Sequence, residues 1–251
     1  MNDNLFYQAL DKGAHTQRLE PVEAMALAQA ITPQRLHALG RAALANRTAR
    51  FNDRATFVFN LQINPANICG AGCTFCNYAA SRHDPHAYVL SEDEILEQVE
   101  NLQPTEAHIV GGLNQVWPYE RNLNLVKRLR STYPDLHIKA FTAVEIAYFA
   151  KTARKSETRI LEELKAAGVD ALPGGGAEIF SERLYRRHWK NKIGPRQWVR
   201  IHQAAHRLGI GTNATMLFGF GDTWRERIEH MLTLRAAQDL TNGFACFIPL
   251  A

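Results

Sequence analysis

The sequence predicts an α/β fold in which parallel strands alternate with helices. Two observations support this prediction: six apolar, strand-like runs recur along the chain, and segments with helical periodicity separate them. A strand, helix, strand order repeated in this way requires parallel strands and right-handed connections. The main choices are a barrel of the TIM type and an open doubly wound sheet. Both place their ligands at the carboxyl ends of the strands.

The six expected strands are short and rich in apolar and β-branched residues, which is typical of strands buried in a parallel sheet. The first, FVFNLQI, is followed closely by a cysteine-rich stretch, and the last, FACFIPL, stands near the end of the sequence. The predicted strands are residues 57–63, 107–110, 136–141, 169–172, 210–218 and 244–250.

Two of the intervening helices have recognisable starts. Ser91 and Glu94 form the pattern of a capping box, in which each side chain binds the other residue's backbone N–H. Thr223 and Glu226 repeat the pattern before a later apolar stripe. Both segments are therefore predicted to be amphipathic helices that cover the sheet.

Proline and glycine mark further helix ends. Pro195 suits the first turn of a helix and Gly209 suits its C-terminal stop, while Gly168 has the same stop position after an earlier helix. Residues 17–46 are predicted to form two helices, with Pro33 near the start of the second. We expect residues 1–50 to be a helical segment packed on the bottom or side of a barrel, and residues 51–251 to be the core domain.

Composition points to an ordinary globular protein of 251 residues, with 46% hydrophobic and 22% charged residues. The N-terminal residues lack the pattern of a signal peptide, and no run of about 18 apolar residues occurs, so we expect a cytoplasmic protein without a membrane partner. The net charge of +4 is spread over the predicted helices. That pattern argues against a nucleic-acid-binding tract.

Three of the four cysteines, Cys69, Cys73 and Cys76, lie in the stretch CGAGCTFC just after the first predicted strand. In a reducing compartment, such a cluster indicates a metal site rather than disulfides. Structural zinc sites and electron-transfer 4Fe-4S clusters take four protein ligands. Three cysteines on a 4Fe-4S cluster leave one iron open to bind a small molecule.

Other residues are alternative fourth ligands. Cys246 is expected to be a small core residue on the same face of the last strand as Phe244 and Ile248. His83 and His86 follow the cysteine cluster, where surface or substrate contacts are the more common role of histidine. A non-catalytic iron-sulfur or zinc protein therefore remains an alternative.

The spacing CxxxCxFC, formed by Cys69, Cys73, Phe75 and Cys76, resembles the signature of radical S-adenosylmethionine (SAM) enzymes, which have a TIM-type barrel. The resemblance implies that the three cysteines hold a 4Fe-4S cluster and that the methionine part of SAM chelates the fourth iron. Reduction of the cluster then cleaves SAM to methionine and a 5′-deoxyadenosyl radical. The resemblance also implies an electron donor such as flavodoxin or ferredoxin.

The same resemblance assigns further residues to SAM. Gly111 and Gly112, in HIVGG, match the glycine motif that receives the methionine amino group, and Phe75 and Tyr78 are expected to flank the adenine. In PGGGAE, Glu178 is expected to contact the ribose hydroxyls or the methionine ammonium. Asn213 is expected to contact the cofactor from the fifth strand.

From about residue 50 onward the sequence is similar to the aminofutalosine synthase family of menaquinone biosynthesis, in stretches such as HIKAFTAVEI and LPGGGAEIF. That family adds the 5′-deoxyadenosyl radical to 3-(1-carboxyvinyloxy)benzoate. The alternatives within the superfamily are a dehypoxanthine futalosine cyclase and a deazaflavin-forming enzyme.

A dicarboxylate substrate requires basic residues near the cofactor. The candidates are His137 and Lys139 on the third strand and Arg82 after the cysteines, and Lys139 has a pairing with Glu145 or Glu178 as its alternative role.

The chain departs from the family pattern in two places. Asn114 and Gln115 stand where the family has a histidine and a proline. The sequence also stops at Ala251, directly after the sixth strand, so we expect a fragment or a chain that a partner completes, with an inactive fragment as the alternative.

Overall fold

The computed structural model describes residues 3–29, 31–114 and 116–251, which fall into two compact units. The first unit extends to Phe57 and includes Asp222–Leu232, and the second comprises Val58–Gly221 and Thr233–Ala251. No helix among these described ranges is both long enough and apolar enough to cross a membrane.

The second unit is built on one sheet of six parallel strands in the order β1-β2-β3-β4-β5-β6. Each strand therefore pairs with the next one in the chain, as in the wall of a barrel. The expected six parallel strands of an α/β fold are confirmed. The strands are β1 (Asn60–Ile63), β2 (Glu106–Ile109), β3 (His137–Ala140), β4 (Ala171–Leu172), β5 (Gly211–Leu217) and β6 (Phe244–Leu250).

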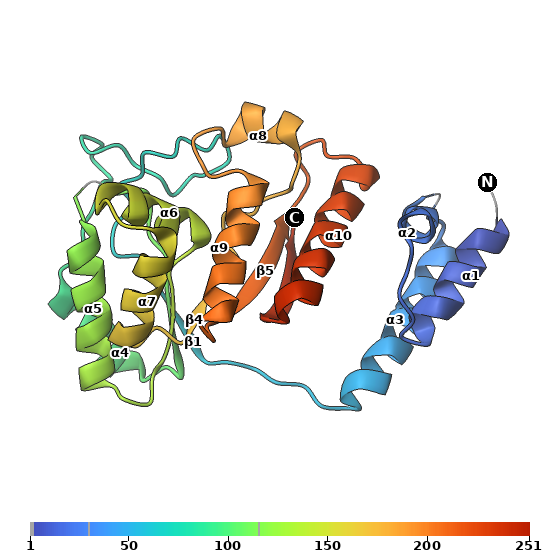
Figure 1. The fold of residues 1–251 in the computed structure, drawn as a ribbon, viewed down its shortest axis with the longest axis horizontal. Helices are drawn as coiled ribbons and strands as arrows, with labels where there is room; N and C mark the ends of the chain where they lie inside the picture. The colour runs from blue at the N-terminus through green and yellow to red at the C-terminus, as the bar shows by residue number, and fades with distance from the viewer. Residues whose placement is uncertain (1–2, 30, 115) are drawn as a thin grey trace. The chain divides into compact units, whose positions relative to one another are not determined.

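Helices connect the strands and lie along the sheet (Figure 1). α5 packs against α7, and α7 against α9, so these three helices form one continuous layer. α10 has its first part in the first unit and its remainder in the second. The helices are α4 (Glu92–Leu102), α5 (Tyr119–Thr132), α6 (Ala143–Thr152), α7 (Glu157–Ala167), α8 (Glu182–His188), α9 (Pro195–Arg207) and α10 (Trp224–Thr241).

The predicted helix ends are confirmed. The Ser91 hydroxyl accepts a hydrogen bond from the Glu94 N–H, and the Glu94 carboxylate accepts one from the Ser91 N–H, which caps α4. Pro195 is the first residue of α9. α7 ends at Gly168, whose φ of +115° lies in the left-handed region that favours glycine.

The two faces of the sheet differ in chemistry. Ile63, Ile109 and Ile138 are fully buried in the core beneath the helices. Successive side chains of a strand point to opposite faces of the sheet, so the residues next to these isoleucines in each strand point to the other, inner face. There the strand register places Gln62, His108 and Lys139 side by side. The core thus lies between sheet and helices, and polar groups line the inner face.

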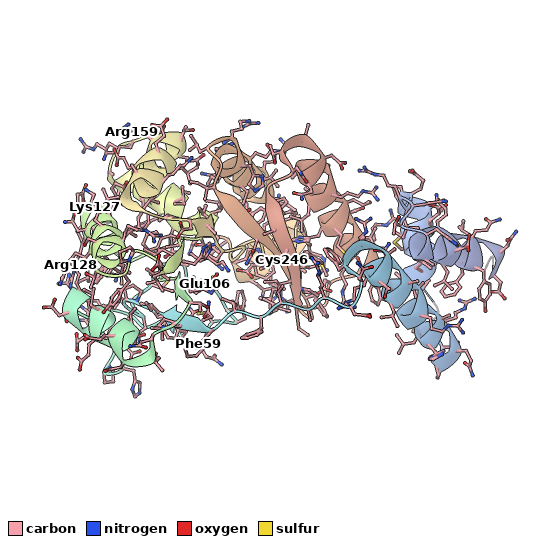
Figure 2. All side chains as sticks on the ribbon, turned by 90° about the horizontal axis from the view of Figure 1, so that it is seen from below. Phe59, Glu106, Lys127, Arg128, Arg159 and Cys246 are labelled. Atoms are coloured by element: carbon pink, nitrogen blue, oxygen red, sulfur yellow. The ribbon has the colours of Figure 1, made fainter. Side chains whose placement is uncertain are left out.

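β6 corrects one prediction from the sequence. Cys246, which Figure 2 labels, was expected to be a buried core residue. It is exposed, as are Phe247, Ile248 and Leu250. The reason is its position, because β6 pairs with β5 on one side only among the described strands. Apolar composition alone did not indicate whether a strand is central or at an edge.

The first strand also differs from its prediction. It was expected to begin at Phe57 but begins at Asn60, where pairing with Glu106 of β2 starts. Phe57 is 96% exposed and takes no part in the sheet. The apolar run therefore extends beyond the paired residues.

Three helices form most of the first unit: α1 (Asp3–Ala14), α2 (Pro21–Ala28) and α3 (Pro33–Phe51). Two helices were predicted in this region, and Pro33 is the first residue of α3 as expected, but α1 was not predicted. α1 contacts both other helices through a buried face. That the N-terminal helices pack on the barrel remains a prediction.

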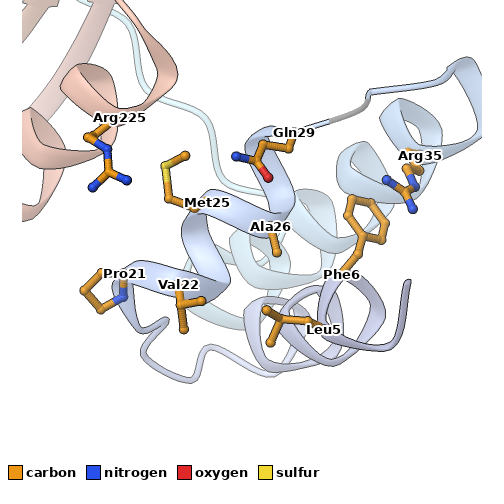
Figure 3. Close-up of a pocket in the computed structure, with 9 residues that line it drawn as sticks. All are labelled: Leu5, Phe6, Pro21, Val22, Met25, Ala26, Gln29, Arg35 and Arg225. Atoms are coloured by element: carbon orange, nitrogen blue, oxygen red, sulfur yellow. The ribbon is translucent and has the colours of Figure 1, made fainter. Parts of the chain in front are cut away.

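Figure 3 shows a cavity of about 460 Å³ in the first unit, with a mostly apolar lining. One side chain at its edge, Arg35, also stacks on the Phe6 ring, with 4.5 Å between the guanidinium carbon and the ring centroid. The cavity contains none of the residues that the sequence assigns to chemistry. Its lining consists of Leu5, Phe6, Pro21, Val22, Met25, Ala26, Gln29, Arg35 and Arg225.

Candidate functional site

A second cavity, of about 230 Å³, lies at the carboxyl ends of the first strands of the sheet. Seven of the predicted site residues line it together: Cys69, Cys73, Cys76, Phe75, Tyr78, Gly111 and Gly112. The loop after β1 and the residues that follow β2, β3 and β4 all contribute to its wall. Its other lining residues are Asn64, Asn67, Ala71, Gly72, Ala79, Val110, Leu113, Thr142, Val144, Glu145, Gly175, Gly176 and Lys192.

The cysteine loop is fixed by backbone hydrogen bonds. The Cys69 N–H donates to the Ala80 carbonyl at 3.2 Å, and the Gly70 N–H donates to the Leu113 carbonyl at 3.1 Å. The Cys76 N–H donates to the carbonyl of Cys73 at 3.2 Å. All three cysteines are free and half-buried. The loop is thus tied to its own return and to the segment after β2.

Backbone N–H groups point at one of the sulfurs. The N–H groups of Ala71 and Leu113 lie 3.4 Å and 3.3 Å from Cys69 Sγ. Donors in this position stabilise negative charge on a bound cluster. The two N–H groups therefore hold Cys69 Sγ in position to act as a ligand.

The three cysteines suit a cluster better than a single ion. Among the described residues, no three cysteine, histidine, aspartate or glutamate side chains are arranged to hold one metal ion. A 4Fe-4S cluster needs no such convergence, because each thiolate binds a different iron. An all-thiolate donor set on a glycine-flanked loop fits such a group.

Gly112 has a structural reason to lack a side chain. A Cβ atom at this position would lie 2.5 Å from Cys69 Cβ and 2.8 Å from the Ile68 carbonyl oxygen. Gly111 is less constrained, because a Cβ there would lie 3.4 Å from Glu145 Oε1. Both glycines were predicted for close approach to a cofactor, and the structure adds that Gly112 makes room for a cysteine.

Glu145 is a site residue that the sequence did not reveal in this role. Its carboxylate is buried and accepts hydrogen bonds from the Gly111 N–H at 2.8 Å and from the hydroxyl of Thr142 at 2.6 Å. Burial raises the pKa of Glu145 to about 7, although these hydrogen bonds oppose the shift. The available signal was the pattern Thr142-x-x-Glu145, a capping box at the start of α6.

The predicted glycine run at the end of β4 removes side chains from crowded positions. A Cβ on Gly174 would lie 2.7 Å from the Asn213 carbonyl oxygen, and one on Gly176 would lie 2.3 Å from Val144 Cγ2. Gly175 and Gly176 also line the cavity. Asn213 is therefore beside this run through its backbone, but it is not part of the cavity lining.

Glu178 lies against a cation that the sequence did not single out. The Lys192 ammonium donates a hydrogen bond to the Glu178 carboxylate, and both side chains are largely buried. Lys192 follows α8 in a loop without any pattern that would mark a site. It lines the cavity next to the cysteines.

Aromatic residues form one wall of the site. Phe75 lies edge-on to Trp189 at a centroid distance of 5.9 Å and packs on Phe220 at 5.2 Å. The hydroxyl of Tyr78 contacts the hydroxyl of Tyr88, and their rings are 6.3 Å apart. Phe75 and Tyr78 both line the cavity, and their contact with an adenine stays a prediction.

Lys139 is already paired. Its ammonium lies 2.7 Å from the buried Glu106 carboxylate, whose second oxygen accepts a 2.6 Å hydrogen bond from the Asn60 amide. Burial raises the pKa of Glu106, but Lys139 and Asn60 outweigh it and hold the pKa below its usual value. The expected pairing with Glu145 or Glu178 is wrong, because Lys139 and Glu106 project from neighbouring strands onto the same face.

The other basic candidates lie apart from the cavity lining. His137 begins β3, at the end of the strand opposite the cysteine loop, 3.7 Å from Glu106 and 3.9 Å from Asp170. Arg82 is exposed on the loop that follows the cysteines. His83 and His86 are also exposed, as expected for surface histidines.

The departure from the family pattern after β2 is only partly visible. Asn114 is buried, and its side-chain oxygen accepts a hydrogen bond from the Val116 N–H at 2.7 Å. Gln115 lies outside the described residues.

Comparisons with known proteins agree with this site. Residues 63–234 match the family model described as the Radical SAM superfamily. The aminodeoxyfutalosine synthase of Thermus thermophilus is 43% identical over 213 residues, which are 83% of this chain and 57% of that protein.

A second curated relative has another activity in its name. The 5-amino-6-(D-ribitylamino)uracil–L-tyrosine 4-hydroxyphenyl transferase of Methanopyrus kandleri is 36% identical over 214 residues, which are 84% of this chain and 58% of that protein. The chain thus spans a little over half the length of these relatives.

The fold is also that of a solved structure. The FeFe-hydrogenase maturase HydG from Carboxydothermus hydrogenoformans superimposes with a TM-score of 0.73 at 17% identity, over 99% of this chain and 57% of that one. At this identity the likeness shows the fold alone.

Proposed function

The chain belongs to the radical SAM superfamily, and we propose that it forms the cluster-binding part of an aminofutalosine synthase. The proposed reaction adds the 5′-deoxyadenosyl group of SAM to 3-(1-carboxyvinyloxy)benzoate, in menaquinone biosynthesis. The observation that carries the proposal is the cavity in which three free cysteines meet two strand-end glycines. The choice of reaction rests on the 43% identity to the synthase of Thermus thermophilus.

We propose that Cys69, Cys73 and Cys76 hold a 4Fe-4S cluster. When bound, the cluster supplies an open iron for SAM and the electron that cleaves its sulfonium bond. The N–H groups that point at Cys69 Sγ stabilise negative charge on this side of the cluster. The half-buried position of the cysteines limits the access of water and oxygen.

We propose that SAM occupies the remainder of the cavity. Gly111 and Gly112 allow the backbone to approach the methionine part, and Phe75 and Tyr78 flank the adenine. Glu145 fixes the backbone at Gly111 through the 2.8 Å hydrogen bond. Its carboxylate also places a group that can carry negative charge beside the proposed position of the methionine ammonium.

Two further residues keep their proposed roles from the sequence. Glu178 is proposed to contact the ribose or the methionine ammonium, in addition to its bond with Lys192. Asn213 is proposed to contact the cofactor from β5. Neither lines the cavity, so their contacts would complete the site from its margin.

We propose Arg82 as the strongest candidate for a substrate carboxylate. Lys139 is neutralised by Glu106 at 2.7 Å, and His137 stands at the opposite end of its strand. Arg82 instead follows the cysteine loop directly and is exposed. We also propose a cytoplasmic location and an electron donor such as flavodoxin or ferredoxin, because the reaction needs a low-potential electron.

Product analysis tests this proposal. The anaerobically reconstituted protein is incubated with SAM, dithionite and 3-(1-carboxyvinyloxy)benzoate, and the products are separated by liquid chromatography and mass spectrometry. We expect aminofutalosine, and we expect none from a Cys76→Ala variant treated in the same way. Unchanged benzoate together with 5′-deoxyadenosine would contradict the proposed reaction while leaving SAM cleavage intact.

A second candidate has support from the 36% identity to the hydroxyphenyl transferase. In that case the chain would join a tyrosine-derived hydroxyphenyl group to 5-amino-6-(D-ribitylamino)uracil. Parallel incubations with tyrosine and this uracil separate the two candidates, since each substrate set gives products of different mass. The first proposal predicts no consumption of tyrosine.

A further inference from the structure

The segment between α8 and α9 is held in a defined conformation beside the cysteine loop. The Lys192 N–H donates to the Trp189 carbonyl at 2.9 Å. The Tyr185 hydroxyl lies 2.9 Å from the Lys190 carbonyl oxygen and 2.7 Å from that of Lys192. The backbone at Lys192 is therefore fixed before any ligand binds.

The same segment is bonded directly to the cysteine loop. The Asn191 side-chain amide donates to the Ala71 carbonyl at 3.1 Å, and the Thr74 N–H donates to the His188 carbonyl at 3.0 Å. The Thr74 hydroxyl and His188 Nδ1 are 2.7 Å apart. Because these bonds lie on both sides of Cys73, the segment and this cysteine are held in register.

The Lys192 side chain is directed into this contact. Its ammonium bonds Glu178 and lies 5.4 Å from the centroid of the Phe75 ring, and Lys192 lines the same cavity as Cys73. The side chain is 15% exposed. It is therefore a largely desolvated positive charge beside one of the three proposed cluster ligands.

Lys192 has an anionic partner in this position, because the Glu178 carboxylate lies against its ammonium and both side chains are largely buried. A buried ammonium is costly without anionic partners. Glu178 supplies one such partner, and a cluster held by Cys73 would supply a second.

We propose that Lys192 sets the reduction potential of the bound cluster through Cys73. The inference rests on the proposed function, because it assumes a 4Fe-4S cluster on the three cysteines. One-electron reduction by an external donor adds one negative charge to the cluster and moves no proton. A fixed positive charge beside a ligand stabilises that added charge more than the oxidised state.

Glu178 modulates the same effect with the opposite sign. Its carboxylate lies against the Lys192 ammonium and offsets part of its field at the cluster. Removal of the two charges should therefore shift the potential in opposite directions. A residue that only supports the fold would not produce this pair of shifts.

The test measures the midpoint potential of the reconstituted cluster. Wild type, Lys192→Met, Lys192→Arg and Glu178→Gln are titrated anaerobically and followed by the EPR signal of the reduced cluster, without SAM so that its binding contributes nothing. Lys190→Met is the matched control, since Lys190 is exposed in the same segment. Iron per chain is measured for every variant.

We expect a more negative potential for Lys192→Met, a nearly unchanged one for Lys192→Arg and Lys190→Met, and a more positive one for Glu178→Gln. Equal potentials in wild type and Lys192→Met at equal iron content would overturn the inference and leave the proposed function standing. If Lys192→Met fails to retain iron, Glu178→Gln decides, and a potential equal to wild type overturns the inference. A wild-type protein without a 4Fe-4S cluster would overturn both.

Discussion

Two buried carboxylates, Glu106 on β2 and Glu145 in the first turn of α6, have opposite electrostatic settings. Glu106 on the inner face is 5% exposed and pairs with Lys139 at 2.7 Å, which holds its pKa below the usual value. Glu145 beside the cavity is 3% exposed and accepts hydrogen bonds from neutral groups, and burial raises its pKa to about 7.

The difference is that Glu106 is paired directly with a cation, whereas Glu145 is hydrogen-bonded to neutral groups. A buried carboxylate that is already paired with a cation gains little from a ligand. Glu145 is hydrogen-bonded to neutral donors and feels only the more distant charge of Lys192, so it gains from a cation that binds it directly. The inner-face pair therefore serves the structure of the sheet, and Glu145 belongs to a binding site. The sequence had suggested Lys139 as a ligand contact, although Lys139 is paired with Glu106.

The largest effect should follow from breaking the inner-face pair. In Lys139→Met the Glu106 carboxylate stays buried without its cation, and we expect a loss of about 3 kcal/mol in the free energy of unfolding. Urea unfolding of the cofactor-free protein measures it. The exposed Lys127→Met is the control, and the double variant Lys139→Met with Glu106→Gln should recover most of the loss. No recovery would mean that the ion pair is not the cause.

Glu145 should give a smaller effect that depends on pH. Its pKa is higher in the folded state than the usual 4.5, so the folded state binds the proton more tightly. Its contribution to stability is therefore fully present below about pH 4.5 and is lost as pH rises through about 7. Relative to Glu145→Gln, the cofactor-free wild type should lose up to about 3 kcal/mol between pH 4.5 and 8.

The measurement is urea unfolding of both proteins at several pH values, and the difference between them isolates Glu145 from other titrating groups. Parallel curves for wild type and Glu145→Gln would contradict the raised pKa. A difference that grows as the pH falls would reverse the sign and assign Glu145 to the class of Glu106.

Alanine substitutions at the two strand-end glycines should give the smallest effects, and they compare how tightly the cavity wall is packed at each position. Gly112→Ala forces its methyl group against Cys69 and the Ile68 carbonyl, with an expected cost of about 1–3 kcal/mol. Gly111→Ala meets only the Glu145 carboxylate at 3.4 Å and should cost less. Thermal unfolding ranks the two variants. An equal loss of stability in both variants would show that the atoms around Gly112 move to accommodate the methyl group.

The alternation of strands and helices and the helix ends could be predicted because their signals are local. The Ser91–Glu94 capping box, Pro195 at a helix start and Gly168 at a helix end depend on a few neighbouring residues. The cysteine loop and its glycines were likewise found by spacing and by position after a strand. These residues meet in one cavity because the carboxyl ends of parallel strands share one edge of the sheet.

The rest depended on contacts between distant segments. Lys192 stands in an irregular loop, and only the fold brings it to Glu178 and Cys73. The partner of Lys139 lies on a neighbouring strand, which the alternation within β3 does not reveal. Cys246 was wrongly expected in the core, because its apolar neighbours do not indicate that β6 lies at an edge.

Anaerobic reconstitution with iron and sulfide tests whether the cavity holds a cluster with one iron open for SAM. We expect about four irons per chain and an EPR signal of the reduced cluster that changes when SAM is added. Cys69→Ala should lose the cluster and the exposed Cys246→Ala should keep it. Tightly bound zinc without iron would rule out the proposed cluster, and a cluster signal that SAM leaves unchanged would rule out the open iron.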